Sequence, residues 1–344
     1  MDTNLLQQRA QKIVAKGKGI LAADESYGTC QKRFEELGVH CTEETRRAYR
    51  QILMTAPETE KYLSGIILFD ETIRQATNDG IPFVKILKEK KIMIGIKVDE
   101  GREALALHEN EKITKGLDRL KGRITEYKEF NAEFAKWRAV IKIKGDEIPS
   151  EACLYTNAHA LARYAAICQE QNIVPIVEPE VLMDGDHDLK RSFEITARIQ
   201  KTLFEELKKQ DIYLPGVILK ASMVIAGKNA KKKSTAEEIA QWTVKCLQEN
   251  VPKEIAGIVF LSGGQNEIEA TENLNVINKM FPTLPWPLTF SYGRALQNPT
   301  LKIWSRDPSN SFHPSSIALL HRCKMSSLAS LGKYTEANEA EYKS

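Results

Sequence analysis

Lys220 is the only charged residue in the apolar run from Gly216 to Lys220, which reads GVILK. Burial in a medium of low dielectric disfavours an ammonium ion, so a buried lysine offers a free amine near neutral pH. Because a free amine attacks ketones, Lys220 is a candidate nucleophile for Schiff-base chemistry. The alternative is a lysine near a strand end whose stem is buried and whose ammonium group reaches water.

Two further stretches place charges two residues apart. Lys136 and Arg138, in the sequence KWR, share one face of a strand, and Lys142 keeps the same parity if no bulge intervenes. Glu178 and Glu180 share a face by the same rule. Two carboxylates close together cannot both ionise freely, which predicts an acid/base pair with one member protonated. An internal salt-bridge network with the lysines is the alternative.

Two glycine-bearing segments have the composition of an anion site. The segment LSGGQ contains Ser262 and Gly263, and the segment SYGR contains Ser291, Gly293 and Arg294. Backbone N–H groups and a helix N-terminus can hold a phosphate there, and an arginine can clamp its oxygens. Either segment alone would more often be a tight turn, but the pair together favours a phosphate site.

The elements that must position these groups recur along the chain. Short apolar runs occupy eight ranges: 18–24, 63–70, 92–99, 134–143, 174–180, 216–223, 257–263 and 287–293. Helical spacing separates them over 43–55, 152–169, 188–209, 237–249 and 267–279. Strands that are apolar nearly throughout, joined by crossovers of helix length, indicate a parallel sheet that is covered on both faces.

Polar residues gather at the carboxyl ends of the runs, and this distribution favours one barrel mouth over the switch point of an open sheet. They are Asp24, Asp70, Lys97, Asp99, Lys142, Glu178, Glu180, Lys220, Ser262 and Ser291. No Gly-x-Gly-x-x-Gly follows the first run, which disfavours a dinucleotide. The predicted fold is α/β, a TIM (β/α)8 barrel: a single domain over residues 1–334 with a flexible C-terminal tail over 335–344.

Composition excludes several other classes. The chain has 344 residues, 42% of them apolar and 28% charged, and a net charge of +3, as expected for a globular protein without a nucleic-acid partner. The six cysteines form no Cys-x-x-Cys pair and suggest reduced thiols in the cytoplasm. The start of the chain does not read as a secretory signal, and no run is long enough to span a membrane. The histidines are scattered singly, so no metal site is expected.

Together these residues resemble the class I fructose-bisphosphate aldolases, which work through a Schiff base without a metal or other cofactor. The matching segments are GKGILAADES (17–26), FAKWR (134–138), VEPE (177–180), DGDHDLKR (184–191), FLSGGQ (260–265) and TFSYGRALQ (289–297). The resemblance extends from about residue 8 to residue 334. It implies reversible cleavage of fructose 1,6-bisphosphate to dihydroxyacetone phosphate and glyceraldehyde 3-phosphate, in glycolysis and gluconeogenesis.

The resemblance also assigns roles to residues. Lys220 would form the Schiff base, Glu178 would be its principal acid/base, and Asp24 would take the proton from the carbon-4 hydroxyl. Lys136 and Glu180 would tune the charge around Glu178. The phosphate and substrate contacts would come from Ser262, Gly263, Ser291, Gly293 and Arg294 at carbon 1, from Lys97, Ser26 and Thr29 at carbon 6, and from Lys32, Arg33 and Arg138 along the approach.

Two departures from the family pattern stand out. Animal members follow the Schiff-base lysine with Pro-Asn-Met-Val, whereas here Lys220 is followed by Ala-Ser-Met-Val. Animal members also end in a mobile segment with a terminal tyrosine that helps protonate the enamine. The present tail is shorter, and its Tyr342 stands near the end without being the last residue.

Alternative functions remain open from the sequence. One is a Schiff-base aldolase for another ketose phosphate, which the site residues alone do not exclude. Another is a scaffold role, for instance with actin as a cytoskeletal partner, but a lapsed enzyme should have lost Lys220, Glu178 or Asp24, and all three are present. The resemblance further implies a homotetramer.

Overall fold

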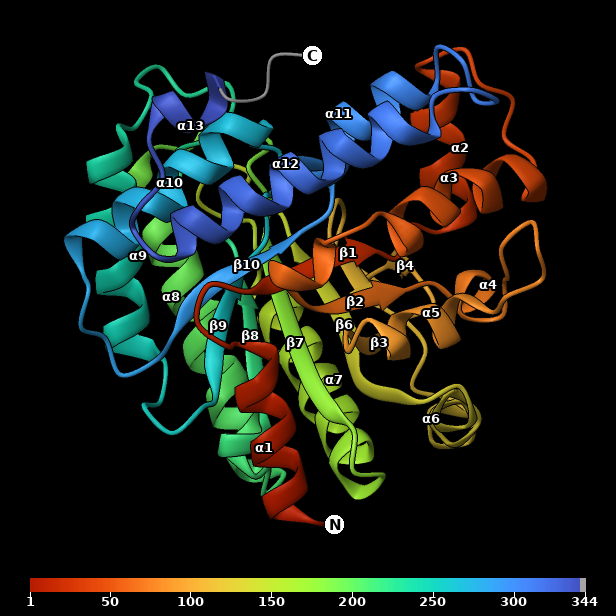
Figure 1. Ribbon diagram of the computed structural model, residues 1–344. Coiled ribbons are helices and arrows are strands. Elements are labelled where there is room, and N and C mark those ends of the chain that lie inside the picture. The colour runs from red at the N-terminus through yellow and green to blue at the C-terminus, as the bar shows by residue number, and fades with distance from the viewer. Residues whose placement is uncertain (341–344) are drawn as a thin grey trace.

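The strands form one closed barrel. The computed structural model describes residues 1–340, and within them eight parallel strands pair in the order β1-β10-β9-β8-β7-β6-β3-β2 (Figure 1). Their bounds are β1 Gly19–Ala23, β2 Leu63–Leu68, β3 Met93–Lys97, β6 Ala132–Ile141, β7 Val174–Val181, β8 Ile218–Ala221, β9 Gly257–Phe260 and β10 Leu288–Tyr292. Each strand falls within or overlaps one of the eight apolar runs, so the predicted (β/α)8 barrel is confirmed.

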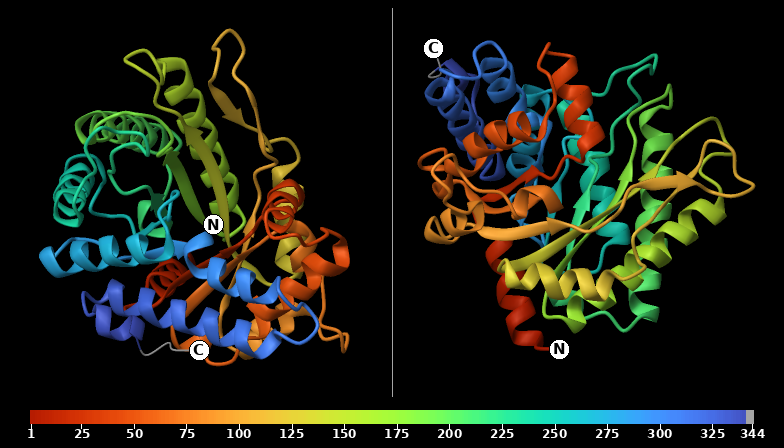
Figure 2. Two further views of the ribbon diagram at one scale, coloured as in Figure 1. Left: turned by 90° about the horizontal axis from the view of Figure 1, so that it is seen from above. Right: turned by 90° about the vertical axis from the view of Figure 1, so that its right-hand side faces the viewer.

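Helices surround the barrel, as the view from above shows (Figure 2). The five predicted helices are present as α3 Glu43–Thr55, α7 Glu151–Glu170, α8 Leu189–Lys209, α9 Ala236–Asn250 and α10 Glu267–Met280. The sequence reading did not identify α1 Thr3–Ile13, α2 Tyr27–Glu35, α4 Asp70–Ile73, α5 Phe83–Glu89, α6 Leu120–Glu129, α11 Arg294–Trp304, α12 Phe312–Ser330 and α13 Glu336–Ala340. None of the helices within residues 1–340 combines the length and the apolar character that a membrane crossing requires.

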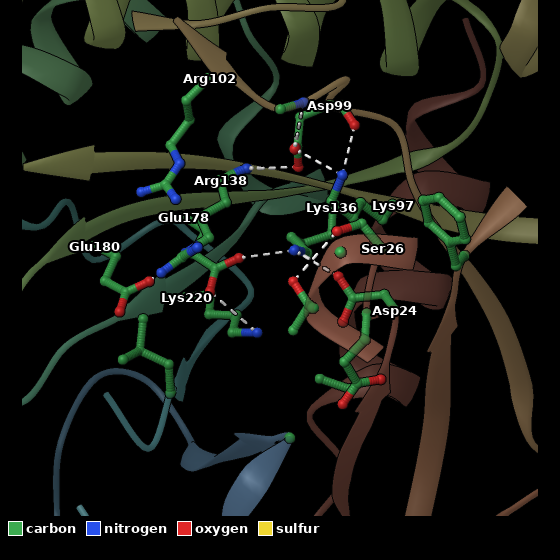
Figure 3. Close-up of a pocket in the computed structure, with 18 of the residues that line it drawn as sticks. Asp24, Ser26, Lys97, Asp99, Arg102, Lys136, Arg138, Glu178, Glu180 and Lys220 are labelled. Carbon is green, nitrogen blue, oxygen red and sulfur yellow. Dashed lines mark hydrogen bonds and ion pairs between the residues drawn. The ribbon is translucent and has the colours of Figure 1, made fainter. Parts of the chain in front are cut away.

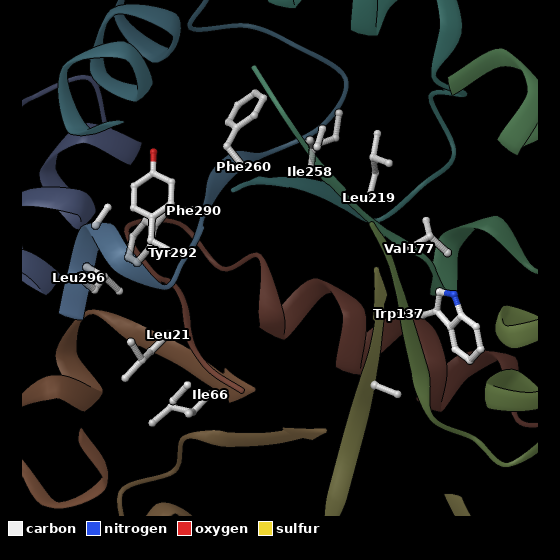
Figure 4. Packing of buried hydrophobic residues seen from close by; sticks show 14 of the residues in the cluster. Leu21, Ile66, Trp137, Val177, Leu219, Ile258, Phe260, Phe290, Tyr292 and Leu296 are labelled. Atoms are coloured by element: carbon white, nitrogen blue, oxygen red, sulfur yellow. The ribbon is translucent and has the colours of Figure 1, made fainter. Parts of the chain in front are cut away.

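Alternation along the strands divides the core into two clusters. Side chains such as Trp137, Val177 and Leu219 belong to the larger cluster, which packs between the strands and the helices (Figure 4). Residues of the opposite parity, including Phe134 and Ile218, form a smaller cluster that fills the amino-terminal half of the barrel. Leu6, Ala10 and Ile13 of α1 join this inner cluster and close the barrel at that end.

The side chains that point into the barrel are apolar at its amino-terminal end and charged at its carboxyl end. On β6, Phe134 is followed at two-residue steps by Lys136 and Arg138, and on β8 Ile218 is followed by Lys220. An inward-pointing side chain near the start of a strand therefore packs in the inner cluster, whereas one near the end of the strand lies at the polar mouth of the barrel.

Gly95 on β3 allows Phe134 to fill the inner cluster. A Cβ added at Gly95 would lie 2.1 Å from Cε2 of Phe134, which is fully buried. We expect Gly95→Ala to lower the free energy of unfolding by about 1–3 kcal/mol, because an overpacked core must shift its side chains or backbone. Gly122→Ala in α6 is the matched control, since no atom lies within 4 Å of an added Cβ there. Chemical denaturation of both variants checks this, and equal midpoints would contradict the packing account.

A hairpin and the start of the predicted tail also differ from the sequence prediction. Between β3 and β6 the chain forms an antiparallel hairpin of β4 Arg102–Ala104 and β5 Lys112–Thr114, which projects beyond the helices (Figure 2). Within the predicted tail, α13 is held by Glu339, which accepts hydrogen bonds from Arg322 at 2.6 and 2.8 Å and from Tyr334 at 3.0 Å. The first part of the predicted tail is thus helical and contacts the barrel domain, whereas Tyr342 lies outside the described residues.

Candidate active site

A cavity of about 1040 Å³ opens at the carboxyl end of the barrel. Its lining includes every predicted site residue that the structure describes: Asp24, Ser26, Thr29, Lys32, Arg33, Lys97, Lys136, Arg138, Glu178, Glu180, Lys220, Ser262, Gly263, Ser291, Gly293 and Arg294. Lys142 follows the end of β6 and is not among the lining residues. Strands and loops far apart in the sequence therefore converge on one mouth.

Lys220 lies deep in this cavity. The residue is 4% exposed, and its Nζ is 3.2 Å from Oε1 of Glu178 on the neighbouring strand β7 (Figure 3). The side chain is therefore buried inside the barrel, and the alternative of an ammonium group that extends to the outer surface is not what the structure shows. Burial places the lysine amine beside a carboxylate that can exchange protons with it.

Glu178 links two lysines. Its Oε1 faces Lys220, and its Oε2 is 3.3 Å from Nζ of Lys136, which in turn is 2.7 Å from Oδ2 of Asp24. Lys136 comes from β6 and Asp24 follows β1, so this last contact crosses the barrel interior. The four groups form a continuous chain of alternating charge.

These charged groups shift the pKa values of Glu178, Asp24 and Lys136. Burial acts to raise the pKa of Glu178, but the nearby Lys136, Lys220 and Arg138 outweigh it and lower that pKa below its usual value. The pKa of Asp24 is lowered in the same way, because Lys136, Lys220 and Lys97 outweigh its burial. Burial opposes the ammonium form of Lys136, yet Asp24 and Glu178 raise its pKa. Both carboxylates are therefore ionised in the resting protein.

Glu180 has a separate partner. Its Oε2 forms a close ion pair with Nε of Arg138 on the neighbouring strand β6. The two glutamates therefore have different cationic partners, and this arrangement replaces the predicted acid/base pair of the two carboxylates. The alternative of an internal salt-bridge network is the arrangement found, because cations on β6 and β8 stand next to each carboxylate.

The end of β10 and the segments that follow β9 and β10 provide groups suited to an anion. Ser291 Oγ is buried and has no hydrogen-bond partner among the described residues. Arg294 is the first residue of α11, which begins directly after Gly293. Gly263 has a φ of +56°, a left-handed conformation that glycine adopts readily. A serine hydroxyl, a helix N-terminus and an arginine thus face one side of the cavity.

On another side of the cavity, the cations are largely committed to protein partners. Lys97 Nζ is 2.8 Å from Oδ1 of Asp99 and also donates to the Asp99 carbonyl at 2.6 Å. Arg33 forms an ion pair with Glu25 and donates to Oε1 of Gln297 at 3.2 Å. These contacts fix the two cations in place.

Several lining residues were not predicted as site residues. Asp99 was noted only as the polar end of a run, although it positions Lys97 and accepts from the Arg138 N–H at 3.3 Å. Arg102 and Lys112 of the hairpin also line the cavity, and no motif pointed to them. The short hairpin strands are largely exposed and lack the apolar character by which the barrel strands were recognised.

The fold and the site define a class of protein: a (β/α)8-barrel enzyme with a buried lysine, paired to a carboxylate, beneath a cationic mouth. Comparisons with known proteins identify the family. The family described as "Glycolytic: Fructose-bisphosphate aldolase class-I" matches residues 5–344. The chain belongs to the class I fructose-bisphosphate aldolase family, and the predicted resemblance is confirmed.

Relatives match over nearly their whole length. A "Probable fructose-bisphosphate aldolase class 1" of Xanthomonas campestris pv. campestris is 51% identical over 97% of this chain and 99% of its own. The "Fructose-bisphosphate aldolase" of Drosophila melanogaster is 51% identical over 96% of this chain and 91% of its own. A solved structure of fructose-bisphosphate aldolase from Plasmodium falciparum, in complex with TRAP and a small-molecule inhibitor, has a TM-score of 0.95. It is 42% identical and covers 97% of this chain and 96% of its own.

Proposed function

We propose that Lys220, Glu178, Lys136 and Asp24 carry out the aldol cleavage of fructose 1,6-bisphosphate in this protein. The supporting observation is the buried chain of contacts in which Glu178 faces Lys220 with one oxygen and Lys136 with the other. The reaction itself is that of the family to which the chain belongs. No metal enters the proposed mechanism.

Schiff-base formation starts with a proton transfer. The Lys220 ammonium group gives a proton to ionised Glu178, and the free amine attacks carbon 2 of the ketose. Glu178 then returns this proton to the carbinolamine hydroxyl, which leaves as water and yields the iminium ion. The low pKa of Glu178 supports this order, because the carboxylate is available as a base at the start.

Cleavage needs a second base. Asp24 takes the proton of the carbon-4 hydroxyl, the bond between carbons 3 and 4 breaks, and its electron pair moves into the iminium ion to give an enamine. Glyceraldehyde 3-phosphate leaves first. The enamine is protonated at carbon 3, a step for which Tyr342 is the candidate acid, and hydrolysis then releases dihydroxyacetone phosphate and the free lysine. Lys136, held 2.7 Å from Asp24, keeps that carboxylate ionised between turnovers.

Trapping the intermediate tests the mechanism. The protein is treated with dihydroxyacetone phosphate and borohydride, which reduces an iminium to a stable amine, and peptide mass spectrometry then locates the adduct. An adduct at Lys220 is expected. Failure to form one, in folded protein that still binds the phosphate, would refute the mechanism and favour a scaffold role.

Arg294 is proposed to hold the carbon-1 phosphate together with Ser262, Gly263, Ser291 and Gly293. We expect Arg294→Ala to raise the KM for fructose 1,6-bisphosphate about tenfold or more, because a charge-assisted contact with the phosphate is lost in the ground state as well as in the transition state. Steady-state kinetics measure this. An effect confined to kcat would mean that Arg294 acts on the chemical step instead.

The cellular setting is also proposed. We expect a homotetramer that works in the cytoplasm, in glycolysis and gluconeogenesis, with a cytoskeletal partner as a secondary role. The Plasmodium falciparum relative was solved in complex with TRAP, which supports a binding partner besides the substrate but does not specify its kind. Light scattering coupled to size-exclusion chromatography tests the tetramer. Comparing turnover of fructose 1,6-bisphosphate with that of other ketose phosphates tests the substrate.

A further inference from the structure

Most cations of the cavity already have a carboxylate partner. Within residues 1–340, Arg33, Lys97, Arg123, Lys136, Arg138 and Lys220 each form an ion pair. Across the same described residues, four lining cations have no ion pair and no side-chain hydrogen bond: Lys32, Arg102, Lys112 and Arg294. The family resemblance already assigns substrate contacts to Lys32 and Arg294, whereas it assigns none to Arg102 and Lys112. The presence in the cavity of these two cations, unpaired within the described residues, therefore needs a separate explanation.

The register of the hairpin places Arg102 and Lys112 on one face. Arg102 lies opposite Thr114, and Ala104 lies opposite Lys112. Opposed residues and residues two apart share a face, so the two cations are diagonal neighbours, with Ala104 and Thr114 at the other two positions. Thr114, on the same face, donates from Oγ1 to the carbonyl of Arg138 at 2.8 Å. This face of the hairpin therefore looks toward the barrel mouth.

The base of the hairpin is fixed to the barrel. Asn157 of α7, which is fully buried, donates to the carbonyl of Lys112 at 2.9 Å and accepts from the Thr114 N–H at 3.4 Å. Glu111 is 5% exposed and accepts from the Ser150 N–H at 2.8 Å. These contacts and the strand pairing thus fix the backbone positions of Arg102 and Lys112, which do not lie on a free loop.

Arg102 is close to a like charge. Partial burial and then the charge of Arg138 lower the pKa of Arg102, while Glu180 and Asp99 act in the opposite direction. Glu180 is already paired with Arg138, and Asp99 with Lys97. Figure 3 shows Arg102 directed toward this group. An additional anion bound here would relieve the repulsion between the two guanidinium groups.

The hairpin lies across the barrel from the first anion site. It connects β3 to β6, whereas Ser262 follows β9, Ser291 lies near the end of β10 and Arg294 follows β10. In the closed barrel, β7 and β8 separate β6 from β9 on one side, and β1 and β2 separate β10 from β3 on the other. Uncommitted cations thus stand on opposite walls of the cavity, an arrangement that suits a ligand with a phosphate at each end.

We infer that Arg102 and Lys112 contact the second phosphate of the substrate and so determine the preference for a bisphosphate over a monophosphate. This inference rests on the proposed function and adds to it a specificity element carried by the hairpin. Lys97, held by Asp99, then supplies the inner charge of this phosphate site, and the hairpin supplies the outer charges.

The test is a double variant, Arg102→Met with Lys112→Met, which removes the charges and keeps the side-chain stems. For fructose 1,6-bisphosphate, kcat/KM should fall about tenfold or more, since two charge-assisted contacts are lost. For fructose 1-phosphate the fall should be at least fivefold smaller. An equal fall for both substrates would show that the hairpin is merely structural, and unchanged kinetics for both would also overturn the inference.

The matched control uses the other face of the same hairpin. Glu103 and Lys115 form an ion pair with an N···O distance of 3.6 Å and do not line the cavity. Glu103→Gln with Lys115→Met should therefore leave the ratio of the two kcat/KM values unchanged. A shift as large as in the first variant would indicate that any loss of charge on the hairpin is sufficient, which would contradict a specific contact.

A binding measurement separates this inference from the mechanism. Hexane-1,6-diol bisphosphate and the corresponding monophosphate are inert to aldol cleavage, and calorimetry gives their affinities for the wild-type protein and the double variant. Loss of about tenfold in affinity for the bisphosphate alone supports the inference even if the borohydride experiment fails. Equal affinities of the variant and the wild type for the bisphosphate would overturn it even if the Schiff base is confirmed.

Discussion

Lys220→Ala is expected to abolish turnover, leaving less than about 1% of the wild-type rate, because the amine that is proposed to form the Schiff base with carbon 2 is removed. Lys220 is 4% exposed at the floor of the cavity, and its nearest carboxylate, Glu178, stays paired with Lys136 in the variant. The fold should therefore persist. A coupled assay of triose phosphate release measures the rate, and circular dichroism checks the fold.

The matched control for this variant is Lys142→Ala. Lys142 belongs to the same inward-facing parity class on β6 as Lys136, but it lies beyond the end of the strand and does not line the cavity. We expect near wild-type turnover and intact borohydride trapping. If Lys220→Ala retained aldol cleavage well above about 1%, another amine would have to be the nucleophile, and the trapped peptide would identify it.

Glu178→Gln is expected to slow Schiff-base formation by about 10²–10⁴-fold, the range over which a positioned acid/base contributes. The amide has nearly the same shape but cannot take the proton of Lys220, which lies 3.2 Å from Oε1. It also removes the negative charge that Lys136 and Lys220 share. Rapid mixing with dihydroxyacetone phosphate, followed by borohydride quenching, gives the rate of the step directly.

Glu180→Gln provides the comparison for this second variant. Its carboxylate pairs with Arg138, and none of its contacts among the described residues is an ion pair with Lys220 or Lys136. Schiff-base formation should therefore slow much less than in Glu178→Gln. Equal rates of trapping in both variants would mean that the overall negative charge near Lys220 matters and that direct contact with Glu178 does not.

Much of the fold could be predicted because it depends on short-range patterns. Eight nearly continuous apolar runs separated by helix-length segments are sufficient for a parallel barrel, since strands buried on both faces need apolar side chains throughout. Helices such as α1 and α12 were missed. α12 has almost no amphipathic pattern, with apolar residues distributed around it. α1 has a local signal that was not used, since Asp2 caps it and its buried residues Leu6, Ala10 and Ile13 recur at helical spacing.

Local sequence patterns are enough to predict which residues face the mouth of the barrel. The two-residue period assigns Lys136, Glu178 and Lys220 to the inward side, and their place at the carboxyl ends of the strands puts them at the mouth. Alternation is a local property of a strand. The inward direction of these side chains can therefore be predicted without knowing which strands are neighbours.

The pairing of the charged side chains, in contrast, depends on the three-dimensional arrangement of the strands. The sequence paired Glu178 with Glu180, whereas the structure pairs Glu178 with Lys136 and Lys220 and gives Glu180 to Arg138. The contact between Lys136 and Asp24 spans the barrel, and the two cations of the hairpin reach the cavity through its pairing register. Such contacts depend on barrel closure and on the relative heights of different strands, which no local pattern in the chain records.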